Sequence, residues 1–222
     1  NRYAAAHATN HGTDSVRRPT LLFFAGALDV CCTGRPIRCA VAELVGPAGD
    51  ADLESVVIHP TLRADAPLAR LPPCTQRAVE RSRGALGSGG ASLGHANLGA
   101  RLGGGGGANE SASAASVMRA ARQMARSRFC LVPAGDECVS SRLYSAIAAG
   151  CLPVVVCDHL QGAFADVARY GAWWIKVPES EFVAPGGPLA LVRRLRAMPA
   201  AEEARRRAAM EAARSEVLYL VD

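Results

Sequence analysis

The chain has 222 residues, of which half are hydrophobic but only 5% are aromatic, and its formal net charge is +5. This length suits one large domain with its own hydrophobic core, or one domain plus part of another. No run of eighteen apolar residues occurs, so no segment has the composition of a membrane-spanning helix. The arginines form several short clusters rather than one stripe, which favours solvated helix faces over a nucleic-acid-binding surface.

The first half of the chain alternates between strand-like and helix-like patterns. Residues 1–18 are polar and irregular and are interpreted as a linker. Residues 20–26 are a continuous apolar run closed by glycine, which is typical of a buried parallel strand. Residues 35–44 carry apolar side chains at helical spacing, and residues 53–60 are interpreted as a second strand that ends at a proline.

Glycine dominates the next segment. Residues 84–107 contain eleven glycines, five of them in a row, so we expect a flexible insertion over about 84–112. A phosphate-binding glycine loop is the alternative, but no strand leads into this segment and no Gly-Lys-Ser/Thr follows it. Asn109 begins an N-glycosylation sequon in what reads as an exposed loop, a weak signal because chance matches are common.

Regular patterns return at Ser113. Helices are predicted over residues 113–127, 140–149, 165–172, 188–198 and 200–220, and strands over residues 129–132, 152–158 and 173–179. A serine, Ser140 or Ser141, is suited to cap the second of these helices, and Gly150 to end it. The sequence therefore predicts an α/β domain over residues 19–222, with a mainly parallel sheet flanked by helices.

The eight cysteines are irregularly spaced and include no C-x-x-C pair, which argues against a zinc ribbon or a thioredoxin-like site. Cys130, Cys151 and Cys157 lie in or beside apolar runs, where cysteine usually serves as a small buried hydrophobe. Cys130 and Cys138 are suited to pair across the intervening loop in an oxidising compartment. His59 and His159 have no second ligand at metal-binding spacing, so no metal site is predicted.

Polar residues follow the strand at 129–132, where open parallel sheets bind their ligands. The next helix presents unpaired N–H groups and a partial positive charge at its N-terminus, which suits a phosphate group. Gly135 allows close approach, Ser140 and Ser141 offer hydroxyls, and Arg142 offers a guanidinium group. Ordinary helix capping and a solvated Arg142 account for the same residues equally well.

Several motifs along the chain agree in order with those of a known family. They are LLFFAG followed by G-x-x-I-R, then F-C-L-V-P-x-G-D, then S-x-R-L-x-x-A-I-x-x-G-C-x-P-V-V-V-x-D, then AFADVARYGAWWIKVPE. In this order they resemble the signature of exostosin-like glycosyltransferases, including the plant and algal branch. The resemblance covers roughly residues 17–222, apart from the glycine-rich insertion.

The resemblance implies a GT-B glycosyltransferase, which consists of two Rossmann-like domains with the active site between them. This chain would be the C-terminal, donor-binding half, and an acceptor-binding domain would precede Asn1, which is not a methionine. The implied reaction transfers a sugar from a nucleotide sugar, often a UDP-sugar, to a glycan or polysaccharide, with no cofactor and no bound metal. The implied location is the lumenal side of the Golgi membrane, with the anchor outside this chain.

The resemblance also implies which residues bind the nucleotide sugar. They are Arg38, Gly135, Ser140, Ser141, Arg142, Ser145 and Asp158. Arg38 is equally well interpreted as a surface cation, and Asp158 as a turn residue. No catalytic base is assigned, because it can lie in the other domain.

The chain departs from the family pattern at two positions. Ser145 stands where the family has a carboxylate that is expected to hold the donor nucleotide, and Ala163 stands where proline is usual before Phe164. A serine still forms a hydrogen bond but loses its charge-assisted strength. Two alternatives therefore stay open: a non-catalytic, degenerate nucleotide-sugar-binding module of the same fold, and an unrelated Rossmann-like nucleotide-binding protein.

Overall fold

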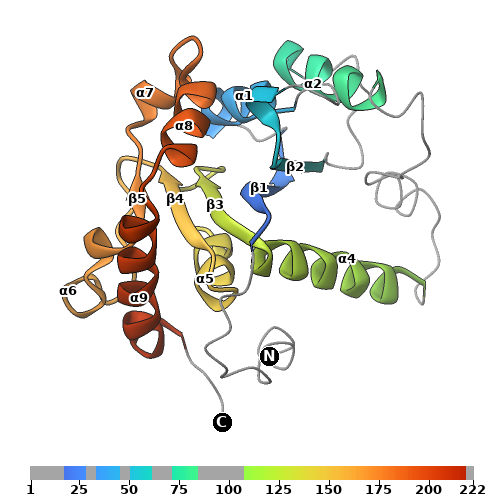
Figure 1. Ribbon diagram of the computed structural model, residues 1–222. Coiled ribbons are helices and arrows are strands. Elements are labelled where there is room, and N and C mark those ends of the chain that lie inside the picture. Colours follow the sequence, from blue (N-terminus) through green and yellow to red (C-terminus); the bar gives the residue numbers. More distant parts are fainter. Residues whose placement is uncertain (1–17, 29–33, 46–50, 62–71, 85–107, 219–222) are drawn as a thin grey trace.

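The computed structural model describes residues 18–28, 34–45, 51–61, 72–84 and 108–218. They form a five-stranded sheet, parallel throughout, with helices on both faces (Figure 1). The strands are β1 (Thr20–Ala27), β2 (Val56–Thr61), β3 (Ser127–Pro133), β4 (Leu152–Val156) and β5 (Ile175–Lys176). The predicted α/β class with a parallel sheet is confirmed.

The described helices follow the strands as α/β connections and as a C-terminal group. They are α1 (Arg35–Glu43), α2 (Pro73–Gly84), α4 (Ala108–Ala125), α5 (Ser141–Ala148), α6 (Ala165–Ala168), α7 (Glu179–Val183), α8 (Gly187–Arg196) and α9 (Ala200–Val217), with short 3-10 turns at Ala51–Leu53 and Tyr170–Ala172. None of the helices in these described ranges is long and apolar enough to cross a membrane.

The strand order is β2-β1-β3-β4-β5. Strand β2 is added on one side of β1, and β3, β4 and β5 are added on the other, so the order of addition reverses between β1 and β3. Leu22 of β1 is in register with Val56 of β2 on one side and with Phe129 of β3 on the other. In parallel sheets of this order, the connections after the two central strands leave on opposite faces and open a crevice at the carboxyl edge. A ligand site is therefore expected where β1 and β3 end.

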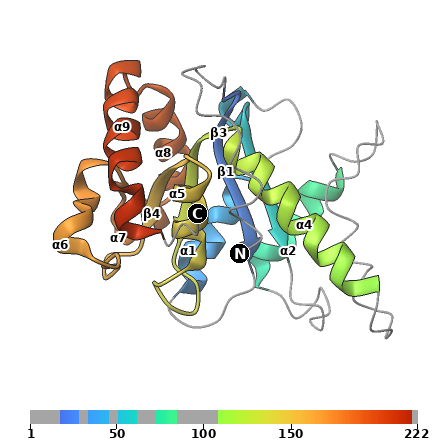
Figure 2. The ribbon, with the colours of Figure 1, turned by 90° about the horizontal axis from the view of Figure 1, so that it is seen from below.

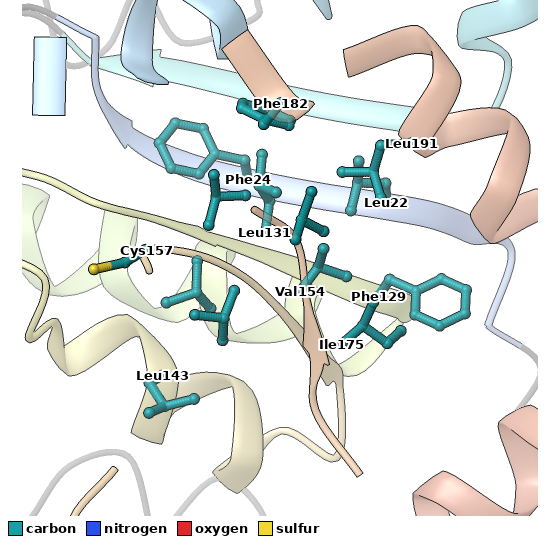
Figure 3. Packing of buried hydrophobic residues seen from close by; sticks show 14 of the residues in the cluster. Leu22, Phe24, Phe129, Leu131, Leu143, Val154, Cys157, Ile175, Phe182 and Leu191 are labelled. Carbon is teal, nitrogen blue, oxygen red and sulfur yellow. The ribbon is translucent and has the colours of Figure 1, made fainter. Parts of the chain in front are cut away.

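The core has two layers, one on each face of the sheet. Alternate residues of β1 point to opposite faces, so Phe24 packs with α1, α7 and α8 while Phe23 packs with α4 and α5. Figure 2 shows α8 and α4 on opposite sides of β1 and β3. In Figure 3, Phe182 and Leu191 lie on one side of the strands and Leu143 lies on the other.

Three elements differ from the sequence prediction. Helix α2 lies between the second predicted strand and the glycine-rich segment, where no helix was predicted; Pro73 occupies its first position, where a missing N–H costs nothing. Strand β5 has only two residues, and Glu179, predicted to end it, begins α7. Helix α4 begins at Ala108, so residues 108–112 are helical and Asn109 lies in a helix rather than in a loop.

The remaining glycine-rich segment, residues 85–107, lies outside the described residues, as do residues 1–17 of the predicted linker. Arg18 is described, and it donates hydrogen bonds to the carbonyls of Met124, Ser127 and Ala149. The last residue of the predicted linker is thus attached to the domain.

Three disulfides join the described cysteines: Cys39–Cys74, Cys130–Cys151 and Cys138–Cys157. The predicted Cys130–Cys138 pair is wrong. Cys130 lies inside β3, about 10 Å below its carboxyl end at the rise of an extended strand, whereas Cys138 lies in the loop beyond that end. Cys130 instead meets Cys151, which immediately precedes β4.

The C-terminal end of α5 is held by three arginines. Arg18 donates to the Ala149 carbonyl at 3.3 Å, Arg214 donates to the Ala148 carbonyl at 2.9 Å, and Arg207 donates to the Gly150 carbonyl. Gly150 has φ +65°, which confirms its predicted role as the left-handed stop of this helix. The last carbonyls of α5 are thus paired with cations, which fixes the helix whose other end lies at the carboxyl edge.

Candidate functional site

The predicted site residues on β3 and α5 lie at the switch point of the sheet. Gly135 lies two residues after the end of β3, and Ser140 is the N-cap of α5. Helix α1, which carries Arg38, follows β1 and begins after Gly34. A Cβ atom on Gly34 would collide with the backbone of Gly135, so the two loops approach as closely as glycine permits.

Arg142 bridges α5 to the end of β1. Its Nε donates to the Ala25 carbonyl at 3.0 Å and its Nη2 donates to the same oxygen at 2.5 Å. The guanidinium group occupies the space above Gly26, where any larger side chain would collide with it. Nη1 has no hydrogen-bond partner in the described part of the chain, so it remains able to bind an anion.

Arg38 is buried, with 4% of its surface exposed. The interpretation of Arg38 as a surface cation is therefore wrong. It donates to the carbonyls of Ala27, Pro133 and Ala134 at 3.0, 3.1 and 2.7 Å. Arg38 therefore ties the end of β1 to the end of β3. Because each of its three nitrogens donates to a carbonyl and the side chain is buried, its main contribution toward a phosphate is its charge.

The two guanidinium groups concentrate positive charge at this edge. Burial, and to a smaller extent the charge of Arg142, lowers the pKa of Arg38 to about 10, although Asp136 opposes the shift. Burial also lowers the pKa of Arg142. Both groups stay protonated at neutral pH. Two largely desolvated cations at the edge where α5 begins favour a multiply charged anion.

The serines of this region have different roles. The Ser140 Oγ accepts from the Arg142 N–H at 3.2 Å, which confirms Ser140 as the N-cap. Ser141 is exposed at the first position of the helix. Ser145 lies one turn further on, and its Oγ donates to the Ser141 carbonyl at 3.0 Å. Ligand binding by these serines stays a prediction.

Asp158 lies after β4 and is paired with Glu179. The Asp158 N–H donates to Glu179 Oε1 at 2.9 Å, and the Glu179 N–H donates to Asp158 Oδ1 at 3.1 Å. Lys176 Nζ donates to the Asp158 carbonyl at 2.7 Å. Asp158 is therefore a capping residue of α7 as well as a candidate ligand.

One group of potential metal ligands occurs among the described residues. Cys138, Cys157 and Glu179 place their ligand atoms within 4.8 Å of one another, but the two sulfurs form a disulfide and are not thiolate ligands.

The loop after Asp158 is fastened to α5 through Ala163. The Ala163 N–H donates to the Tyr144 hydroxyl at 3.4 Å, and the Tyr170 hydroxyl donates to the Ala163 carbonyl at 2.8 Å. A proline at position 163 would lack this N–H. The departure from the family pattern at Ala163 thus coincides with a contact that only a non-proline residue makes.

An aromatic ring and a disulfide that shape the site were not predicted from the sequence. Phe24 lies beneath both guanidinium groups, and the Cys138–Cys157 disulfide fastens the loop after β3 to the end of β4. An aromatic residue inside an apolar strand gives no signal of such a role. Disulfide partners are set by distance in space rather than by spacing along the chain.

Comparison with known proteins agrees with this geometry. Residues 4–192 match the family described as the exostosin GT47 domain. The chain is 34% identical over 77 residues to a probable arabinosyltransferase, ARAD1, of Arabidopsis thaliana, a match that covers 35% of this chain and 17% of that protein. It is 36% identical over 58 residues to a probable glycosyltransferase of the same plant, covering 26% of this chain and 12% of that protein.

These two alignments span less than a fifth of each relative, whereas the family match extends over most of the present chain, including β1, β3, β4 and α5. The chain therefore belongs to the exostosin GT47 family of glycosyltransferases.

Proposed function

We propose that this chain is the donor-binding part of a glycosyltransferase that transfers a sugar from a nucleotide sugar, with UDP as the nucleotide, to a glycan or polysaccharide acceptor. The diphosphate of the donor lies at the N-terminus of α5, next to Arg142. The acceptor and the catalytic base belong to a part of the protein outside this site.

The observation that carries the proposal is the position of α5. Its N-terminus, with Arg142, stands at the carboxyl edge between β1 and β3, where sheets of this order bind nucleotides. Nη1 of Arg142 is available for hydrogen bonding within the described ranges. Family membership supplies the sugar-transfer chemistry.

Transfer of the sugar leaves negative charge on the departing diphosphate. The positive end of the α5 dipole and the guanidinium group of Arg142 stabilise this charge as it develops, and the buried charge of Arg38 adds to the same field. We propose that these groups act without a bound metal ion or another cofactor.

The second candidate is a non-catalytic nucleotide-sugar-binding module. Ser145 favours it, because its hydroxyl donates to the helix backbone and supplies no charge where the family has a carboxylate. Such a module would bind UDP but would not turn over any UDP-sugar.

We further propose that the protein works on the lumenal side of the Golgi membrane, anchored by a segment outside this chain. Support comes from the three disulfides between described cysteines, since such bonds persist in oxidising compartments and are rare in the cytosol. The proposal includes no nucleic-acid partner.

Isothermal titration with UDP tests donor binding, and the full-length protein incubated with a panel of UDP-sugars and glycan acceptors tests transfer. The proposal expects one UDP site per chain and acceptor-dependent release of UDP from at least one donor. Absence of UDP binding at millimolar concentration would overturn it. UDP binding without turnover of any donor would favour the non-catalytic module.

A further inference from the structure

We propose that the Cys138–Cys157 disulfide positions the donor-binding loop, so that affinity for a nucleoside diphosphate depends on this bond. The inference rests on the proposed function, because it concerns the same site. It assigns to one disulfide a role in binding that is separate from its role in stability.

The disulfide joins the loop after β3 to the end of β4. Cys138 lies in the loop of residues 134–140, between Gly135 and the N-cap Ser140. Cys157 directly follows β4, and its Cα lies 5.8 Å from that of Cys138. The bond therefore crosses from the candidate phosphate-binding loop to the neighbouring strand of the sheet.

Cys157 is held in place by the core and by its neighbours. Cys157 is 1% exposed and belongs to the hydrophobic core, and Figure 3 shows it toward the same end of the sheet as Phe24. The next residue, Asp158, is held by Glu179 and by Lys176. Cys157 is thus a rigid attachment point.

Few backbone hydrogen bonds hold the Cys138 side of the bond to the sheet. The Ala134 N–H donates to the Val156 carbonyl at 2.9 Å, but the Gly135 N–H donates within the loop, to the Glu137 carbonyl. Beyond Ala134, no backbone hydrogen bond among the described residues joins residues 135–139 to a strand. Val139 is 68% exposed. Among the described residues, the disulfide is therefore the covalent link between this part of the loop and the sheet.

The conformation of this loop affects the affinity for a ligand that binds to it. A ligand that needs one loop conformation binds more weakly, in proportion, when that conformation is only partly populated in the free protein. A covalent link that restricts the loop to the binding conformation removes this loss. Without the link, Gly135 and the N-terminus of α5 still exist, but their relative placement must be fixed by the ligand itself.

The chain offers a matched control. Cys39–Cys74 joins α1 to α2 and encloses 35 residues of sequence separation, compared with 19 for Cys138–Cys157. In the loop-closure model, removing the bond with the longer separation destabilises the folded state at least as much, because it frees the larger loop in the unfolded chain. The Cys39–Cys74 bond does not touch residues 134–140, so its removal changes stability without changing the donor loop.

The experiment compares wild type with Cys138→Ser/Cys157→Val and with Cys39→Ser/Cys74→Ser by isothermal titration with UDP and by thermal unfolding. Valine keeps an apolar side chain at the buried position. We expect the first variant to raise the Kd for UDP about tenfold or more, and the control to change it less than twofold. Equal effects of the two variants on UDP affinity overturn the inference, whatever their melting temperatures.

A second measurement avoids folding without the bond. In the Cys39→Ser/Cys74→Ser protein, brief treatment with dithiothreitol and then iodoacetamide reaches the partly exposed Cys138 before the buried Cys130–Cys151 pair. A Kd for UDP that rises with alkylation of Cys138 supports the inference, and an unchanged Kd overturns it. Failure of wild type itself to bind UDP is a distinct result, which overturns the proposed function.

Discussion

Arg38 and Arg142 lie against the same aromatic ring, with their Cζ atoms 5.1 and 4.8 Å from the centroid of Phe24. One comes from α1, after β1, and the other from α5, after β3. Their hydrogen bonds within the described residues go to backbone carbonyls, so the two charges are held at the crevice without a carboxylate hydrogen-bond partner. Arg38 braces the two strand ends, and Nη1 of Arg142 has no hydrogen-bond partner among the described residues.

Replacing Arg142 tests its contact with the donor. Arg142→Lys keeps the charge but loses the planar fork that donates to Ala25 while facing the ligand. We predict that the Kd for UDP rises about tenfold or more, since hydrogen bonds to charged groups contribute about 1.5–3 kcal/mol. Isothermal titration measures it, with Arg205→Lys, an exposed position on α9, as the control. A Kd within twofold of wild type would remove Arg142 from the site.

Arg38 is predicted to matter more for stability than for direct binding. Arg38→Met keeps much of the volume but leaves the carbonyls of Ala27, Pro133 and Ala134 without their donors. We expect a loss of about 3 kcal/mol or more in the free energy of unfolding, from about 1–3 kcal/mol for each buried group left unpaired. Denaturant unfolding at pH 7 measures this loss. A cost below about 1 kcal/mol would contradict the bracing role.

The Glu203 carboxylate provides a prediction about pH. Burial acts to raise its pKa, but hydrogen bonds from Arg128 and Arg207, together with their charges, outweigh burial and hold the pKa below its ordinary value of 4.5. A lowered pKa in the folded state contributes stability that is present above pH 4.5 and is lost as the pH falls through the folded-state value.

Glu203→Gln should therefore destabilise the domain by about 1–3 kcal/mol at pH 7, and this difference from wild type should shrink as the pH falls below 4.5. Urea unfolding over a pH series measures it. Glu202→Gln is the matched control, because Glu202 forms a more exposed pair with Arg206, for which about 0.3–0.5 kcal/mol is expected. A difference for Glu203→Gln that stays constant with pH would refute the assignment.

Ser145 tests which of the two functional candidates holds. In Ser145→Glu the carboxylate returns to the position that the family pattern assigns to donor binding, and we expect UDP to bind about three- to tenfold more tightly, because charge-assisted hydrogen bonds are about twice as strong as neutral ones. Inorganic pyrophosphate, which lacks the ribose, should show no gain. Unchanged or weaker UDP binding would contradict the assigned position, and a gain far above tenfold would favour the degenerate module.

Much of the sheet was predictable because a strand buried on both faces has a continuous apolar sequence. Leu21–Phe24 and Val154–Val156 are of this kind, and all are buried. Helix α5 was predictable because Ser140 and Gly150 mark its ends with distinct backbone chemistry. The order of these motifs also pointed to the family.

Other features depend on distances that a sequence does not contain. Arg38 reads as a surface cation until β3 brings the carbonyls of Pro133 and Ala134 to it. The pairing of Cys138 with Cys157 depends on the adjacency of β3 and β4. Helix α2 was not predicted, although proline is well suited to a first helical position, where Pro73 lies.

The most direct test of the account is hydrogen–deuterium exchange of the protein with and without saturating UDP, read out on the peptide that spans Gly135 to Arg142. We predict slower exchange in this peptide when UDP is bound, because UDP covers the N-terminus of α5 and the loop that the disulfide of Cys138 joins to the end of β4. We predict no change in α2, which lies away from the switch point between β1 and β3. UDP-dependent protection confined to another part of the chain, with none in this peptide, would contradict the account.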